Sequence, residues 1–110
     1  MSEQSSWKVE FSIRARNDLV ELYDALVAEI EEPKIALRVV KNLRLQALKL
    51  ADFPYAHRRV PTKKFTEHDI RFTASGNYLA LFRIDEDAHS VQVLRFVHTK
   101  RNLEAIEISN

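Results

Sequence analysis

The 110-residue chain has no cysteine, a single glycine, three prolines and no long apolar run. Without cysteine there is no disulfide framework and no thiolate metal site. The scarcity of glycine and proline argues against disordered or collagen-like structure. The apolar runs are too short for a membrane span, and the N-terminus lacks the basic and apolar regions of a signal peptide. We therefore expect a soluble, cytoplasmic protein that binds no membrane.

The remaining composition is that of one small globular domain. An apolar fraction of 45% in a chain of this length supports one core, so residues 1–110 are expected to form a single domain. His57, His68 and His89 are scattered in predicted loops without the spacing of metal ligands. We therefore expect no metal site, and nothing in the sequence calls for a cofactor.

The net charge of +1 is nearly neutral, but its distribution is uneven. The second half is modestly basic. Its basic pairs are Arg58-Arg59, Lys63-Lys64 and Lys100-Arg101. This half is compatible with an anionic partner, although a solvated charged face is the simpler interpretation.

Alternating and helical patterns divide the chain into elements. Alternation around Val9 predicts a first strand. Apolar residues at helical spacing predict one helix within Ile13–Glu31, with Asn17-Asp18 suited to its start, and a second helix from Pro33 to about Ala51. A loop over Phe53–Phe65 follows. The later apolar runs predict three strands, at Ile70–Thr73, Tyr78–Ile84 and Val91–Val97.

These elements predict an α+β fold. The last three strands are joined by short turns and should form an antiparallel meander, whose two long strands are buried on both faces. The helical hairpin has to bury its apolar stripe, and one face of this sheet is the available surface. The N-terminal strand can then join an edge of the sheet.

Several charged residues are expected to be structural. Arg95 lies on an otherwise apolar strand and should pair with a carboxylate, because a buried unpaired charge is very costly. Arg71 and Arg83 could form salt bridges with acids of the first helix, such as Glu21 or Asp24.

The motifs of nearly the whole chain resemble, in order and spacing, the ParE/RelE superfamily of toxins from type II toxin–antitoxin modules. Within it the ParE branch is the nearer. The motifs are L-x-x-x-P at Leu50–Pro54, an arginine after a hydrophobic residue at Ile70-Arg71, Y-x-x-x-x-R-I at Tyr78–Ile84, and V-x-V-L-R-x-x-H-x-x-R at Val91–Arg101.

This resemblance implies a growth-inhibiting toxin, often called a plasmid stabilisation protein, that a cognate antitoxin neutralises in a hetero-oligomer. ParE-like members poison DNA gyrase without chemistry of their own, whereas RelE-like members cleave mRNA on the ribosome. The RelE pattern has an arginine directly after a Gly-Tyr pair and a C-terminal tyrosine. Here Leu79 follows Tyr78, and the tail Asn102–Asn110 has no tyrosine. Gyrase is therefore the expected target. Ribosome-dependent mRNA cleavage is the first alternative, and a non-toxic family member that acts only as a binding partner is the second.

The resemblance also implies site residues. Arg71, Arg83, His98 and Arg101 are expected to bind the target. If the protein is a nuclease, His98, Arg101 and Arg71 become the catalytic candidates, because RNA cleavage needs proton transfer and cations at the phosphate. Structural roles are the alternatives: His98 could bond backbone at a strand end, and Arg101 could cap a carbonyl or pair with Glu104.

An antitoxin-binding surface is predicted on the second helix. Leu37 and Leu48 lie off its main apolar stripe, so they either add core contacts or face a partner. Antitoxins of this class commonly wrap the toxin with a C-terminal segment that folds on binding. We therefore expect these two leucines to contact that segment.

Overall fold

The computed structural model describes residues 6–108, so the first residues of the stretch searched for a signal peptide lie outside the described part. The helices are α1 (Ile13–Ile30), α2 (Pro33–Leu48) and the one-turn α3 (Lys63–Thr66). The strands are β1 (Lys8–Phe11), β2 (Arg71–Ser75), β3 (Tyr78–Asp85) and β4 (Ser90–His98). Short 3₁₀ turns are η2 (Lys49–Ala51), η3 (Pro54–Ala56) and η4 (Leu103–Ala105).

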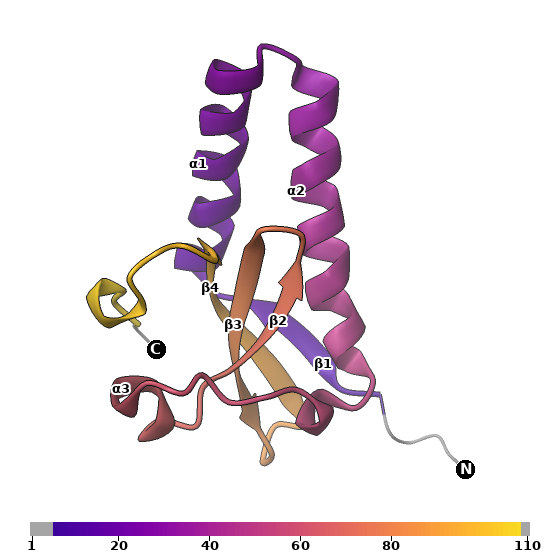
Figure 1. The fold of residues 1–110 in the computed structure, drawn as a ribbon. Coiled ribbons are helices and arrows are strands. Elements are labelled where there is room, and N and C mark those ends of the chain that lie inside the picture. The colour runs from indigo at the N-terminus through magenta and orange to yellow at the C-terminus, as the bar shows by residue number, and fades with distance from the viewer. Residues whose placement is uncertain (1–5, 109–110) are drawn as a thin grey trace.

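The strands of the described residues form one four-stranded sheet in the order β1-β4-β3-β2. β2, β3 and β4 are the predicted antiparallel meander, and β1 joins the edge beside β4 in parallel. The helical hairpin lies between β1 and the meander in sequence and covers one face of the sheet (Figure 1). The predicted α+β fold is confirmed.

The helical hairpin begins and turns where local chemistry allows. Ser12 caps α1, because its Oγ accepts a hydrogen bond from the Ala15 N–H at 3.0 Å. The helix lies within the predicted range Ile13–Glu31, but the role expected of Asn17-Asp18 at its start was wrong. Glu31 ends α1 in a left-handed conformation at φ 61°, and Pro33 opens α2, where a missing N–H costs nothing.

Two apolar cores lie on opposite faces of the sheet. On the helix side, Leu43, Ala47 and Leu50 pack against residues of β3 and β4 such as Phe82 and Val93. The two long strands are thus buried on both faces, as predicted, because the other face is also covered. Its cover contains Val60, Phe65 and Ile106 over Leu81, Leu94 and Val97.

The cover of the second face comes from two segments without a predicted role in packing. One is the region expected to be a loop, which contains η3 and reaches α3. The other is the C-terminal segment, residues 102–108, whose Ile106 is fully buried.

Within residues 6–108, no helix has both the length and the apolar character of a membrane span.

Candidate partner-binding surfaces

Arg71, a predicted site residue, is buried at the start of β2. Its Nη1 donates to the carbonyl of His57 at 2.8 Å and to that of Tyr55 at 3.4 Å, and its guanidinium lies 5.2 Å from the centre of the Tyr55 ring. The nearest acid is Asp69, at 3.9 Å from Nη2, so the expected pairing with acids of α1 was wrong. Arg71 therefore fastens the segment after α2 to the sheet. Burial and the charge of Arg71 lower the pKa of His57 below its usual 6.5.

Arg83 lies on the face away from the helices, where it borders a small pocket with Phe65 and His68. Its Nη2 donates to the Gln92 side-chain oxygen at 2.8 Å on the neighbouring strand. The acids of α1 named as its possible partners are on the opposite face of the sheet.

His98 and Arg101 lie together at the end of β4. His98 Nδ1 accepts the backbone N–H of Lys100 at 3.0 Å, and its ring meets the Tyr78 ring edge-on at 5.1 Å. The structural role considered for His98 is thus present. Arg101 is exposed, and among residues 6–108 its side chain neither caps a carbonyl nor pairs with Glu104.

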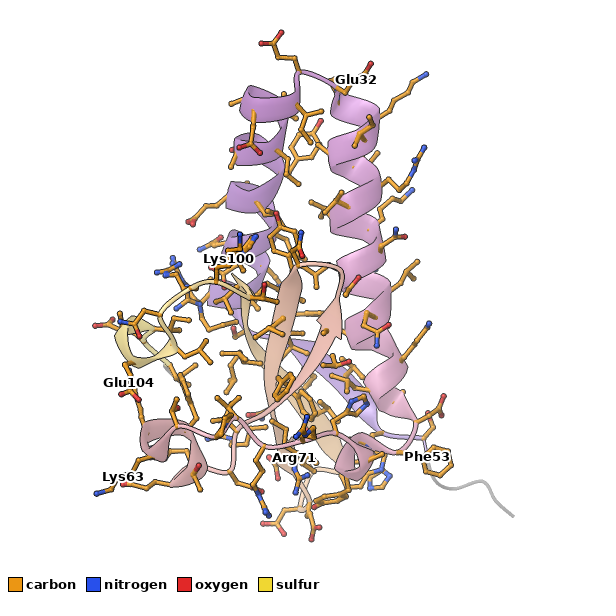
Figure 2. The ribbon with its side chains drawn as sticks, viewed as in Figure 1. Glu32, Phe53, Lys63, Arg71, Lys100 and Glu104 are labelled. Carbon is orange, nitrogen blue, oxygen red and sulfur yellow. The ribbon has the colours of Figure 1, made fainter. Side chains whose placement is uncertain are left out.

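The structure does not bring the three catalytic candidates together. Arg71 lies opposite Phe82, and His98 lies opposite Tyr78. These two β3 positions are four residues apart, which is about 13 Å along a strand. Figure 2 shows Arg71 and Lys100, the neighbour of Arg101, at opposite ends of the sheet.

A basic groove of about 610 Å³ lies beside Arg101. We use this name for the groove lined by Arg14, Lys64, Arg95, Arg101, Ala105, Glu107 and Ile108. Lys64 Nζ donates to the Ile106 carbonyl, which fixes the lysine against the C-terminal segment. Arg101, in contrast, is exposed at the rim and available to an anion.

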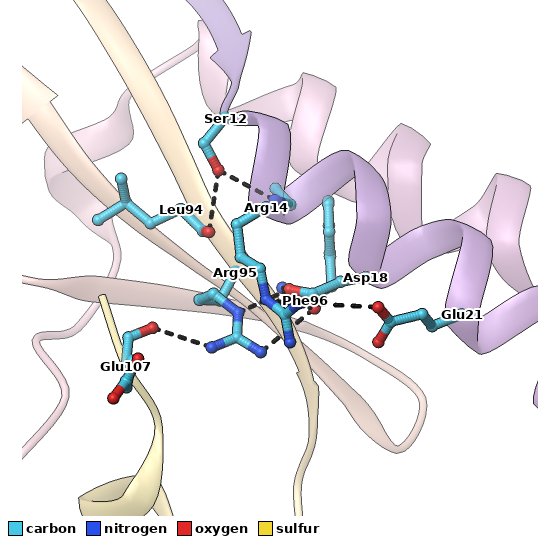
Figure 3. A network of polar contacts seen from close by, with 9 residues as sticks. Ser12, Arg14, Asp18, Glu21, Leu94, Arg95, Phe96 and Glu107 are labelled. Atoms are coloured by element: carbon cyan, nitrogen blue, oxygen red, sulfur yellow. Dashed lines mark hydrogen bonds and ion pairs between the residues drawn. The ribbon is translucent and has the colours of Figure 1, made fainter. Parts of the chain in front are cut away.

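Arg95 belongs to a buried polar network behind this groove (Figure 3). Arg95 was predicted to pair with a carboxylate, and that carboxylate is Asp18. Arg14 Nε lies 3.5 Å from the same carboxylate. Arg95 also donates to the Glu107 carbonyl at 2.9 Å. Its polar atoms are occupied, so it contributes charge to the groove but few free donors.

The outward face of α2 carries an exposed apolar stripe. Leu37 is 47% exposed and Leu45 is 54% exposed, whereas Leu48 is less exposed, being half-buried. Leu37 and Leu45 line a shallow groove of about 390 Å³. Its other lining residues are Lys34, Arg38, Lys41 and Asn42. In the structure Leu37 therefore shares a groove with Leu45 and not with Leu48. The sequence reasoning had missed Leu45. We call this the α2 groove.

Two solved structures with this fold are of toxin–antitoxin systems. The chromosomal ParDE system from P. aeruginosa matches with a TM-score of 0.73 at 21% identity, covering 88% of this chain and all of the other. The toxin–antitoxin complex RelBE2 from Mycobacterium tuberculosis matches with a TM-score of 0.59 at 23% identity, covering 89% and 97%. At these identities, the likeness concerns the fold. No curated protein is matched by the sequence.

The sequence itself assigns the family. Residues 9–103 match the family model of the ParE toxin of the type II toxin–antitoxin system parDE. The chain belongs to this toxin family, as the motifs had predicted.

Sequence reasoning missed the contributions of Arg14, Lys64 and Phe53 to the surface. Arg14 and Lys64 line the basic groove only because α1 and α3 lie near the C-terminal segment. Phe53 is 77% exposed, although an aromatic residue in an apolar region of the sequence normally predicts burial. A pattern-based signal existed for Lys64 alone, as part of a basic pair.

Proposed function

We propose that this toxin inhibits growth by binding and poisoning DNA gyrase in the cytoplasm, with no chemistry of its own. The observation that carries this proposal is the ParE family match over residues 9–103. The separation of Arg71 from His98 supports it, since a nuclease needs its acid, base and phosphate-binding groups within reach of one phosphodiester.

The test is a DNA cleavage assay with purified protein, gyrase, ATP and supercoiled plasmid. Linear or nicked DNA should accumulate with the toxin and be absent when the cognate antitoxin is added first. A folded toxin that inhibits growth but yields no gyrase-dependent cleavage product would contradict the gyrase target.

The cognate antitoxin is the proposed neutralising partner, and the α2 groove its proposed binding site. The lining of that groove combines two exposed leucines with Lys34, Arg38 and Lys41. An amphipathic segment with apolar residues on one side and carboxylates at its margins fits this surface. The toxin and antitoxin would form a hetero-oligomer in which this segment orders on binding.

Ribosome-dependent cleavage of mRNA is the alternative function, and the basic groove is the observation that favours it. Arg14, Lys64 and Arg101 present positive charge where a phosphate backbone could lie. Purified protein with translating ribosomes and a labelled transcript tests this alternative, with ribosome-dependent cleavage of the transcript as the positive result.

A non-toxic member that acts only as a binding partner is the second alternative. Induction of the chain alone in a bacterial host distinguishes it, because normal growth with soluble, folded protein would exclude both toxic mechanisms.

A further inference from the structure

Phe53 combines an unfavourable backbone conformation with an exposed aromatic side chain. Its φ of 53° and ψ of 55° are left-handed, a region that a bulky residue rarely adopts and that glycine or asparagine adopts easily. This conformation forms the turn from η2 into η3, in which the Phe53 carbonyl accepts the Ala56 N–H at 3.0 Å. It does not require an aromatic ring. The side chain is 77% exposed, so core packing does not account for it either.

Other rings lie near the same turn. Trp7 donates its backbone N–H to the Ala51 carbonyl at 2.9 Å, which holds the start of β1 next to the turn. The Trp7 ring stacks on His89 at 3.9 Å and meets Tyr55 edge-on at 5.9 Å. We call Trp7, Phe53, Tyr55 and His89 the aromatic patch. In Figure 2, Phe53 projects away from the ribbon at this end of the molecule.

Exposed carboxylates border the aromatic patch, and the buried Arg71 guanidinium lies 5.2 Å from the centre of the Tyr55 ring. Asp52, Glu86 and Asp87 are exposed, and the Tyr55 hydroxyl donates to the Glu86 carboxylate, which raises the pKa of the phenol. Exposed rings can also stack on nucleic-acid bases, but that mode needs a cationic surround for the phosphates. Carboxylates at the border favour a protein with basic side chains instead.

We propose that the aromatic patch is the surface with which the toxin contacts its protein target, Phe53 entering an apolar pocket that basic side chains border. Exposed, pre-positioned aromatic residues are the usual anchors of protein interfaces. A backbone conformation that costs stability and yields no internal contact is typical of functional positions. The inference rests on the proposed toxin function and adds to it the place of contact.

The aromatic patch is separate from the α2 groove. Leu37 lies in the first turns of α2, whereas Phe53 follows its C-terminal end beyond η2. Leu37 and Leu48 alone are about 16 Å apart along the helix axis. Of the target-binding residues predicted from the sequence, Arg71 lies next to this patch, under the Tyr55 ring, and His98 and Arg101 lie at the other end of the sheet.

The variant Phe53→Gly separates function from folding. Glycine relieves the left-handed conformation, so the urea midpoint of unfolding should stay the same or rise. The concentration needed for gyrase poisoning should rise at least about tenfold, while the affinity for the antitoxin should be unchanged. Phe53→Tyr keeps a ring and should retain activity. Val20→Ala is the matched control, because Val20 is also an exposed apolar residue but lies on α1, away from the patch.

Growth inhibition on expression distinguishes this inference from the choice of target. If Phe53→Gly inhibits growth as the wild type does, the inference is overturned and the toxin function stands. If the wild type inhibits growth without acting on gyrase, and Phe53→Gly does not inhibit it, gyrase is the wrong target and the aromatic patch is supported. Weakened antitoxin binding by Phe53→Gly would assign the patch to the antitoxin and overturn the inference. A wild-type protein that leaves growth normal would overturn both.

Discussion

The Asp18 carboxylate on α1 and the Arg95 guanidinium on β4 form a buried, two-point ion pair. Asp18 Oδ2 lies 2.8 Å from Arg95 Nε, and Oδ1 lies 3.2 Å from Nη2. The backbone N–H of Phe96 donates to the same carboxylate at 3.0 Å. Since Arg95 also holds the Glu107 carbonyl, one cluster connects the first helix, the second strand from the sheet edge and the C-terminal segment.

Replacing Asp18 with Asn should destabilise the protein strongly. The amide keeps the shape of the side chain but leaves the Arg95 charge buried without a counter-charge, which typically costs about 3–5 kcal/mol. Urea unfolding followed by circular dichroism measures this free energy. Asp24→Asn, at an exposed position of the same helix, should change it by less than about 0.5 kcal/mol. Similar small changes in both variants would contradict a structural role for the pair.

The need for a partner of Arg95 could be predicted from the sequence, but the partner could not. A lone arginine in an apolar strand requires a carboxylate because burial of an unpaired charge is costly. Asp18 was assigned to the start of α1 because aspartate favours helix ends. Its real role depends on the packing of α1 on β4, seventy-seven residues away, which no local pattern encodes.

Replacing Ile106 with Ala should also destabilise the fold. Ile106 is fully buried in the core on the sheet face opposite α1 and α2, and truncation of a buried isoleucine to alanine typically costs about 2–5 kcal/mol. The same unfolding assay applies. Ile13→Ala is the matched control, because Ile13 is 76% exposed and should lose little. Equal, small effects would show that the C-terminal segment contributes little to folding.

The segments that cover the second face of the sheet could not be predicted from sequence patterns. The helices and strands follow from periodicity, which is strong in α1, α2, β3 and β4. The segment of residues 57–70 and the C-terminal segment lack such periodicity, since single residues such as Val60 and Ile106 are buried by tertiary contacts. The predicted site was incomplete for the same reason. Arg71 and His98 belong to the same series of sequence motifs, but the folded chain places them at opposite ends of the sheet.

His57 should make stability depend on pH. Burial and the positive charge of Arg71 lower its pKa in the folded state below the unfolded value of 6.5. The unfolded chain therefore binds more protons, and the free energy of unfolding falls as the pH drops from about 7.5 to about 5.5. His57→Gln should reduce this slope, as urea unfolding at several pH values would measure. An unchanged slope would mean that His57 is not the group responsible.

Charge placed in the α2 groove should weaken antitoxin binding. Leu37→Asp and Leu45→Asp each put a carboxylate at an exposed apolar contact, so the dissociation constant should rise about tenfold or more while the fold persists. Leu48→Asp should cost more stability, because Leu48 is half-buried. Isothermal titration with the antitoxin measures the affinity, and Val20→Asp on α1 is the control. Unchanged affinity in both groove variants would exclude the α2 groove as the binding site.

The double variant His98→Asn with Arg101→Ala separates the two toxic mechanisms. Asparagine can still accept the Lys100 N–H that His98 accepts now, and Arg101 is exposed, so the fold should be retained. A nuclease that used His98 as its acid or base would lose about 10²–10⁴-fold in transcript cleavage. A toxin that acts by binding gyrase through the other end of the sheet should still inhibit growth. We expect inhibition to persist in cells expressing the variant, with gyrase-dependent DNA cleavage at wild-type toxin concentrations. Loss of inhibition together with loss of transcript cleavage on ribosomes, in a variant that unfolds at the wild-type urea concentration, would instead favour the ribosome as the target.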